Sequence, residues 1–297
     1  MKKFAPLFVI IAASFWGIDG IVLRPELYSL PVTLVVFVES TIVALLLSPF
    51  YLTKIRALKN LKTKDWLSFA GVALFGGAIG TLAITKSLFY VNFVNLSIVV
   101  LIQKLQPVFA LILANILLKE KLPKKFFIWA STAVIGAYVM TFGDNLVNLN
   151  TGDKTAEAAL FSLIAAFSFA SSTVFSKRAL RNVDYGLGTY LRFIFSAVIL
   201  LIIAGSIGDI NSFGTVSNHQ WMIFFIIAFT SGGLAIFLYY YGLKNISASV
   251  ATICELAFPL TAIVLEYFIR DNILSLIQWF GVLLLIVSIL KVTRIGK

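Results

Sequence analysis

Ten long apolar segments occupy most of this 297-residue chain and limit the folds that it can adopt. A helix needs roughly 20 apolar residues to cross a bilayer, and these segments are close to that length. The sequence therefore predicts an all-α integral membrane protein with ten transmembrane helices. The segments that we expect to span the membrane are about Phe4–Leu23, Pro31–Leu52, Trp66–Thr85, Asn92–Leu118, Phe126–Phe142, Ala156–Phe175, Gly186–Ala204, Gln220–Tyr241, Ser247–Ile269 and Ile273–Val292.

The composition indicates the same class of protein. Hydrophobic residues make up 60% of the chain and charged residues only 12%, whereas about a quarter of a soluble domain is charged. The single cysteine, Cys254, excludes an internal disulfide and any multi-cysteine metal site. Because the predicted spans use most of the sequence, we expect no separate soluble domain, no cofactor and no metal.

The net charge of +11 is distributed in a pattern typical of membrane topology. With ten spans and a cytoplasmic amino terminus, the inside segments hold 18 lysines and arginines. The outside segments hold 4, namely Arg24, Lys86, Lys154 and Arg270. Cytoplasmic loops are enriched in these residues. We therefore expect a multi-pass protein of the cell inner membrane, with both termini in the cytoplasm and no nucleic-acid partner.

Pro107 and Pro259 each lie ten residues after a serine, inside an apolar segment. A proline within a helix removes one backbone hydrogen bond and leaves the carbonyl group four residues earlier without its donor. Those carbonyl groups belong to Gln103 and Glu255. Interrupted helices beside polar side chains form the binding sites of many transporters near the bilayer midplane. We therefore predict helix kinks at the two prolines and a solute site beside them.

The two prolines are one sign that the chain contains the same five-helix unit twice, since 152 residues separate them (259 − 107). Because five is an odd number, the second unit enters the membrane from the opposite side, which predicts inverted repeats. We expect the first repeat at 1–146, an extracytoplasmic linker at 147–155 and the second repeat at 156–297. An offset of 153 also aligns residues 12–17 with 165–170, Gly80 with Gly233, and Glu39 with Arg192.

Short motifs occur in a fixed order along the ten segments. They are Phe15-Trp16-Gly17 in the first, a proline midway through the fourth and ninth, and Leu118-Lys119-Glu120-Lys121-Leu122 after the fourth. In this order the chain resembles the EamA-type branch of the drug/metabolite transporter superfamily over nearly its whole length. The resemblance implies alternating access through a central cavity, often for export of amino acids or related metabolites, and dimer contacts through the fifth helices. The chain departs from the family pattern at Glu39, where many relatives carry an arginine.

Lys104 and Glu255 are the leading candidates among the ionisable side chains in the spans, where each such group costs roughly 3 kcal/mol. Gln103, Lys104, Gln106 and Pro107 share one arc of the fourth helix. One hypothesis is a buried ion pair that only neutralises two charges. In the other, Lys104 receives a substrate carboxylate or phosphate while Glu255 takes an amine or a proton. We favour the second, because a structural pair brings little net stability, and we expect Glu255 to couple transport to protons.

Other intramembrane residues have several interpretations. Glu39 and Arg192 are expected to form an ion pair across the repeat axis, a gate, or two separate anchors. Asp19 shares a helix face with Trp16, where the aromatic group either contacts a cation or simply packs.

Polar residues nearer the predicted span ends complete the candidate set. Asn92 and Asn95 either contact the solute or cap the fourth helix. Glu266 is expected close to the outer edge, within reach of water. We interpret Tyr239–Tyr241 as interfacial anchors, because tyrosine is enriched at membrane surfaces.

Motifs for catalysis are missing from the sequence. The lone His219 has no metal-ligand cluster around it, and the sequence contains no Walker-type phosphate loop. We therefore predict a secondary active transporter, not an enzyme. It would carry a small amphoteric metabolite such as an amino acid, coupled to protons or to exchange, with efflux of cationic or lipophilic drugs as the alternative. Outside transport, the alternatives are an intramembrane enzyme and a membrane scaffold.

Overall fold

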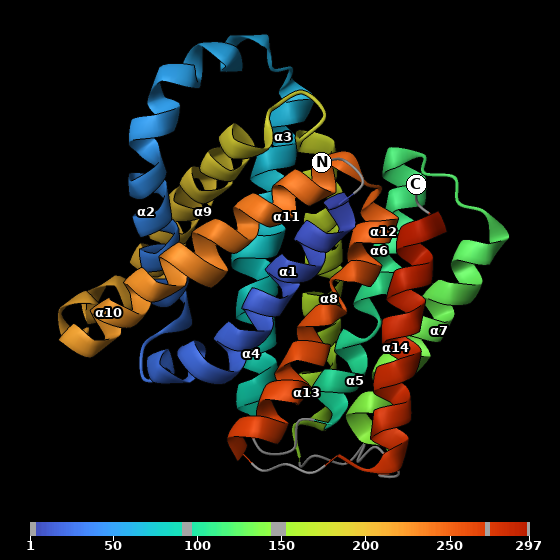
Figure 1. Cartoon of the computed structure of the whole chain (residues 1–297). Helices are drawn as coiled ribbons and strands as arrows, with labels where there is room; N and C mark the ends of the chain where they lie inside the picture. Colours follow the sequence, from blue (N-terminus) through green and yellow to red (C-terminus); the bar gives the residue numbers. More distant parts are fainter. Residues whose placement is uncertain (1–3, 91–96, 144–152, 271–273, 296–297) are drawn as a thin grey trace.

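The computed structural model describes residues 4–90, 97–143, 153–270 and 274–295, and within these ranges all regular structure is helical (Figure 1). Ten helical stretches are long and apolar enough to cross a membrane. This confirms the predicted fold class. The α-helices are α1 (Ala5–Ile18), α2 (Val32–Tyr51), α3 (Thr63–Gly71), α4 (Gly80–Tyr90), α5 (Ser97–Gln103), α6 (Gln106–Leu118), α7 (Lys124–Phe142), α8 (Thr155–Ala179), α9 (Tyr185–Ile207), α10 (Asn218–Ile227), α11 (Gly233–Asn245), α12 (Ala248–Cys254), α13 (Ala257–Arg270) and α14 (Leu276–Ile295).

Several spans consist of two helices with an irregular joint between them. Short π-helical segments, η5 (Val72–Ile79) and η7 (Ala228–Gly232), join α3 to α4 and α10 to α11. A third, η2 (Asp19–Leu23), continues α1. Such π-segments are rare and are often found at functional sites. Those in the third and eighth spans are at equivalent places in the two halves of the chain.

The helix contacts follow a twofold pattern that exchanges the two halves. The second and seventh spans, α2 and α9, pack against each other, and so do the fifth and tenth, α7 and α14. Helix α1 of the first half packs against α11 and α13 of the second half. In the same way, α8 of the second half packs against α4 and α6 of the first half. Figure 1 shows α1 and α8 in the middle of the bundle, one in front of the other. This is the arrangement expected of two inverted five-helix repeats.

Small residues allow α7 and α14 to approach closely. A Cβ atom on Gly136 would lie 2.8 Å from the backbone nitrogen of Leu285, and one on Gly281 would overlap the backbone of Met140. Lipid provides no hydrophobic drive for helices to associate, so close backbone packing of this kind stabilises membrane bundles.

Both termini lie at the same end of the bundle (Figure 1), and hydrogen bonds between the two halves close that end. The carboxylate of Glu120 accepts hydrogen bonds from the backbone N–H groups of Ala248 and Ser249, at 2.8 and 3.1 Å, and from the Ser249 hydroxyl at 2.6 Å. It therefore caps the amino terminus of α12, where a negative charge is favoured. Arg181 of the second half also donates to the carbonyl of Leu118 of the first half, at 3.3 Å. The motif that follows the fourth span thus has a structural role.

Candidate functional site

The fourth and ninth spans are interrupted at equivalent positions, just before the two prolines. The fourth breaks at Lys104–Leu105 and the ninth at Glu255–Leu256. Pro107 and Pro259 then lie in the first turns of α6 and α13, where a missing N–H group costs nothing. The expectation that the Glu255 carbonyl lacks a donor was wrong, because the backbone N–H of Phe258 donates to it at 2.9 Å. The interrupted turn at Glu255 therefore has a hydrogen bond between residues three apart, in place of the usual four.

The Glu255 carboxylate accepts hydrogen bonds from side chains on three other helices. Its Oε1 atom accepts hydrogen bonds from the Tyr239 hydroxyl on α11 at 2.7 Å and from the Thr173 hydroxyl on α8 at 3.2 Å. Its Oε2 atom accepts one from the Gln106 amide, at the start of α6, at 3.2 Å. Glu255 and Gln106 remain half-buried, although they lie within membrane spans. We call these four residues the Glu255 cluster. Both repeats contribute to it.

An aromatic wall adjoins this cluster. The Trp16 and Tyr239 rings are 5.3 Å apart, and the Trp16 indole N–H donates to the carbonyl of Ser231 in η7 at 3.0 Å. Tyr239 is only 3% exposed, so its assignment as an interfacial anchor was wrong. A buried phenol needs a hydrogen-bond partner, and Glu255 provides it. The sequence signal for this contact was weak, because Tyr239 is one of three consecutive tyrosines near the end of its span.

The expected approach of Lys104 to Glu255 does not occur. Lys104 is half-buried and forms no side-chain hydrogen bond or ion pair within the described ranges. Gln103 points elsewhere and donates to the carbonyl of Ser162 on α8 at 2.8 Å. The prediction that these residues share one arc assumed a continuous helix. The break at Lys104–Leu105 changes the helical phase, so the side chains of Gln103 and Gln106 point in different directions. Of that predicted set, only Gln106 contacts Glu255.

A second buried polar cluster joins the first two spans. Arg24 donates to Asp19 at 2.6 Å and to Glu39 at 2.7 Å. The exposed fractions of the three side chains are 31%, 8% and 11%. We call these residues the Arg24 cluster. Glu39 therefore pairs with Arg24, and the predicted ion pair with Arg192 was wrong. The π-helical turn brings Asp19 beside a residue five positions later, which reasoning from spacings of three and four did not anticipate.

Arg192 lies near Tyr240 on α11. Its guanidinium carbon is 5.8 Å from the ring centroid, and its Nη1 atom is 3.5 Å from the hydroxyl. That hydroxyl also lies 3.0 Å from the Ser176 hydroxyl. Arg192 thus has an aromatic partner within the core. Asn92 and Asn95 lie outside the described residues, as does the side chain of Glu266.

The arrangement provides hydrogen bonds and an aromatic surface, and it lacks the groups of a metal centre. Among the described residues no group of three histidine, cysteine or acidic side chains could hold a metal ion. Trp16, Gln106 and Glu255 are half-buried, and the buried Tyr239 and Thr173 lie behind them, so one aromatic ring lies beside a hydrogen-bond donor and an acceptor. Such a surface can bind a planar polar solute.

Comparisons with known proteins agree with this architecture. The model of the EamA-like transporter family matches residues 3–142 and again residues 156–294. The chain is 43% identical to the Riboflavin transporter ImpX of Fusobacterium nucleatum, over 98% of this chain and 97% of the relative. It is 26% identical to an uncharacterized transporter, YwfM, of Bacillus subtilis, over 97% and 93% of the two chains.

A solved crystal structure has the same fold, with a TM-score of 0.75, and covers 100% of this chain and 99% of the other at 15% identity. Because the family model matches both halves of the chain, the protein is a multi-pass membrane transporter and not an enzyme. The chain belongs to the EamA-like transporter family.

Proposed function

We propose that this protein transports riboflavin or a closely related flavin across the membrane, and that the flavin binds beside Trp16, Tyr239 and the Glu255 cluster. The observation that carries the proposal is 43% identity, over almost the full length of both chains, to a protein named as a riboflavin transporter. This substrate replaces the amino acid that we expected from the sequence alone.

The chemistry of the cluster supports a flavin. The isoalloxazine ring system is planar and aromatic, and one edge carries alternating carbonyl and N–H groups. An aromatic side chain such as the half-buried Trp16 stacks on planar rings. The Gln106 amide and the Glu255 carboxylate supply a donor and acceptors for the polar edge.

An amino acid fits the same residues less well. Its ammonium and carboxylate groups call for two opposite charges close together. Lys104 and Glu255 were the expected pair, and they form no ion pair in the structure. Riboflavin is uncharged near neutral pH, so it needs no such pair. The half-buried Glu255 then acts through hydrogen bonds to the solute.

Alternating access would use the breaks in the fourth and ninth spans as flexible joints. Each break lies within its span, nearer the first residue of that span than the last, and beside a residue of the site. Hydrogen bonds of Glu120 and Arg181 join the two halves at the end that holds both termini. Opening that end requires these bonds to break, and the inverted repeat provides a second, equivalent way to close the other end.

Topology and energy coupling are part of the proposal. The excess of lysine and arginine in alternate loops supports cytoplasmic termini and a location in the cell inner membrane. The repeats occupy 1–146 and 156–297, with the linker at 147–155 outside. Transport is coupled to protons through Glu255 or proceeds by exchange. Two copies would associate through their fifth and tenth spans.

Counterflow in vesicles tests the proposed substrate. Purified protein is reconstituted into vesicles loaded with unlabelled riboflavin, and entry of labelled riboflavin is followed over time. We expect saturable accumulation that excess unlabelled flavin abolishes. A panel of labelled amino acids and one cationic drug is run in parallel. Accumulation of a panel member with none of riboflavin would overturn the assignment while retaining a carrier.

A further inference from the structure

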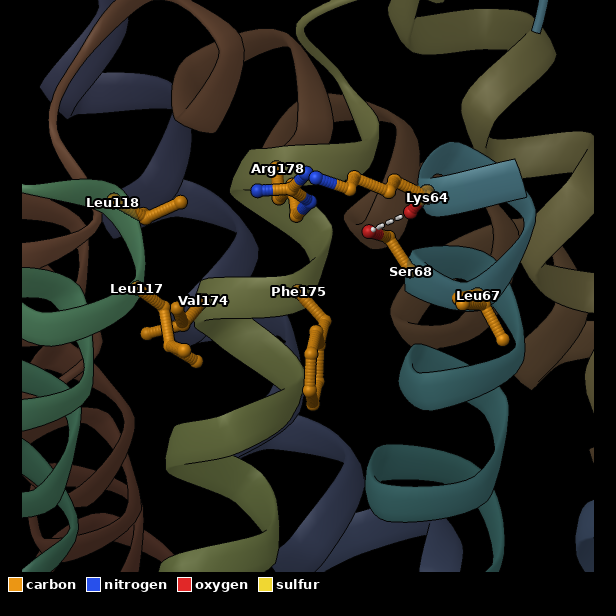
Figure 2. Close-up of a pocket in the computed structure, with 8 residues that line it drawn as sticks. All are labelled: Lys64, Leu67, Ser68, Leu117, Leu118, Val174, Phe175 and Arg178. Atoms are coloured by element: carbon orange, nitrogen blue, oxygen red, sulfur yellow. Dashed lines mark hydrogen bonds between the residues drawn. The ribbon is translucent and has the colours of Figure 1, made fainter. Parts of the chain in front are cut away.

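A groove between α3, α6 and α8 lies apart from the proposed flavin site (Figure 2). It encloses about 330 Å³. It lies where α3 begins and where α6 and α8 end, which is the end of the bundle that holds both termini. Its lining residues are Lys64, Leu67, Ser68, Leu117, Leu118, Val174, Phe175 and Arg178.

Two cations meet at the mouth of this groove. Figure 2 shows the Lys64 side chain extending from α3 towards Arg178 on α8. Within the part of the chain that the structure describes, neither side chain has a hydrogen-bond or ion-pair partner. The neighbouring cations differ, because Lys177 donates to the carbonyl of Leu243 and Arg181 to that of Leu118. Two like charges held together without a counter-charge favour the binding of an anion.

Below the cations the groove is apolar and open to the side. Leu67 is 63% exposed and Leu117 43% exposed, and exposed apolar side chains on spanning helices face lipid tails. Phe175 and Val174 form the floor on α8 (Figure 2). The groove thus combines a cationic mouth at the membrane edge with walls that face hydrocarbon.

The groove and the flavin site use different faces of α8. Thr173 contacts Glu255 and Tyr239. At about 100° per residue, Phe175 and Arg178 lie on roughly the opposite face of the helix from Thr173. A ligand in the groove would therefore lie on a different face of α8 from a flavin at the Glu255 cluster.

We propose that this groove binds an anionic phospholipid. The phosphate would lie between Lys64 and Arg178, and one acyl chain would follow Leu67, Leu117 and Phe175. Basic pockets between helices at the cytoplasmic edge recognise anionic headgroups in this way. The apolar walls favour a lipid over free phosphate, because a free anion would leave Leu67 and Leu117 without a partner. The site is independent of which solute the protein carries.

Native mass spectrometry of the purified protein tests this site. The protein is equilibrated in mixed micelles with equal amounts of phosphatidylglycerol and phosphatidylcholine, and the retained lipids are counted. We expect wild type to retain phosphatidylglycerol preferentially. Lys64→Gln should lower that retention about fivefold, and Lys64→Gln with Arg178→Gln more than tenfold. Lys64 is exposed and has no side-chain bond among the described residues, so the single variant is expected to fold normally.

The matched control removes two cations elsewhere at the same membrane edge. Lys124 and Lys125 are exposed in the first turn of α7, and Lys124→Gln with Lys125→Gln should leave retention unchanged. An equal loss in this control would show a diffuse charge effect and overturn the proposal. Displacement of the lipid by millimolar inorganic phosphate, with no preference between the two lipids, would identify a free-phosphate site and overturn it as well. Unchanged retention of phosphatidylglycerol by Lys64→Gln would also overturn the proposal.

Discussion

Glu39 and Glu255 are both carboxylates inside the membrane region, and the protein satisfies them in different ways. Glu39 is buried and forms an ion pair with Arg24, which also binds Asp19. Glu255 is half-buried and accepts hydrogen bonds from Tyr239, Thr173 and Gln106. The first carboxylate is held by a full charge within its own repeat. The hydrogen bonds to the second come from neutral donors of both repeats.

The difference separates a structural cluster from a binding site. A carboxylate paired with an arginine cannot exchange partners without leaving a buried charge unpaired. Hydrogen bonds from neutral groups are individually modest, at about 1 kcal/mol each, so a solute can replace them. We therefore expect changes in the Arg24 cluster to affect stability and changes in the Glu255 cluster to affect transport.

Arg24→Gln is expected to have the largest effect. It leaves the buried carboxylates of Asp19 and Glu39 without their cation, and breaking a buried pair costs roughly 3–5 kcal/mol. Because Arg24 is 31% exposed, we expect a loss near the lower end, about 3 kcal/mol. Denaturant unfolding of the purified protein measures it. Adding Asp19→Asn and Glu39→Gln should restore most of the stability, and a loss below about 1 kcal/mol would show that the cluster is not structural.

Glu255→Gln should lower riboflavin counterflow about 30-fold while changing stability by less than about 1 kcal/mol. The NH₂ group of glutamine can donate to the hydroxyl groups of Tyr239 or Thr173, so the fold keeps its hydrogen bonds. The solute loses one acceptor oxygen, and an unsatisfied buried polar group costs roughly 1–3 kcal/mol, or about 30-fold at about 2 kcal/mol. If Glu255 couples transport to protons, the variant also loses its response to an imposed pH gradient. Glu26→Gln is the matched control, since the Glu26 side chain is 51% exposed beside His219. An equal loss of riboflavin counterflow in Glu255→Gln and Glu26→Gln would contradict a specific role of Glu255 in transport.

Tyr239→Phe should weaken riboflavin affinity about fivefold, because it removes one hydrogen bond worth about 1 kcal/mol and keeps the aromatic ring. Tyr240→Phe provides the control on the next residue. Its hydroxyl lies near Ser176 and Arg192 and makes no contact with Glu255 among the described residues. Affinity can be measured by isothermal titration. If Tyr240→Phe weakens binding as much as Tyr239→Phe, the site extends to Arg192.

Lys104→Gln is expected to change riboflavin counterflow by less than about twofold, because Lys104 makes no ion pair with Glu255 in the structure. A loss comparable with that of Glu255→Gln would restore the hypothesis that Lys104 and Glu255 act together on a charged solute.

The features predicted correctly from the sequence depend on strong local signals. Ten apolar segments of membrane-spanning length gave the fold class, and the family model matches each half of the chain. The interruptions next to Pro107 and Pro259 follow from the missing N–H group of proline. These signals are properties of a single segment, so no tertiary contact is needed to recognise them.

The side-chain partners could not be predicted, because they depend on local departures from the regular α-helix. A π-helical turn places Arg24 beside Asp19, and Arg24 had been counted only as a topology signal. Because of the break at Lys104–Leu105, the side chains of Gln103 and Gln106 point to different partners. Tyr239 was identified as a membrane-edge residue although it contacts Glu255 in the structure. In the first two cases the helical phase assumed from the sequence was interrupted, whereas Tyr239 lies in the regular helix α11 and its burial depends on tertiary packing.

The most direct test of the central claim is a fluorescence titration of riboflavin with the purified protein. Stacking against Trp16 should quench flavin emission in a saturable way. We predict that Glu255→Gln combined with Tyr239→Phe abolishes the saturable quenching, whereas Glu26→Gln retains it. Saturable quenching of equal amplitude and affinity in the double variant would show that the flavin binds elsewhere, and the account of the site would be wrong.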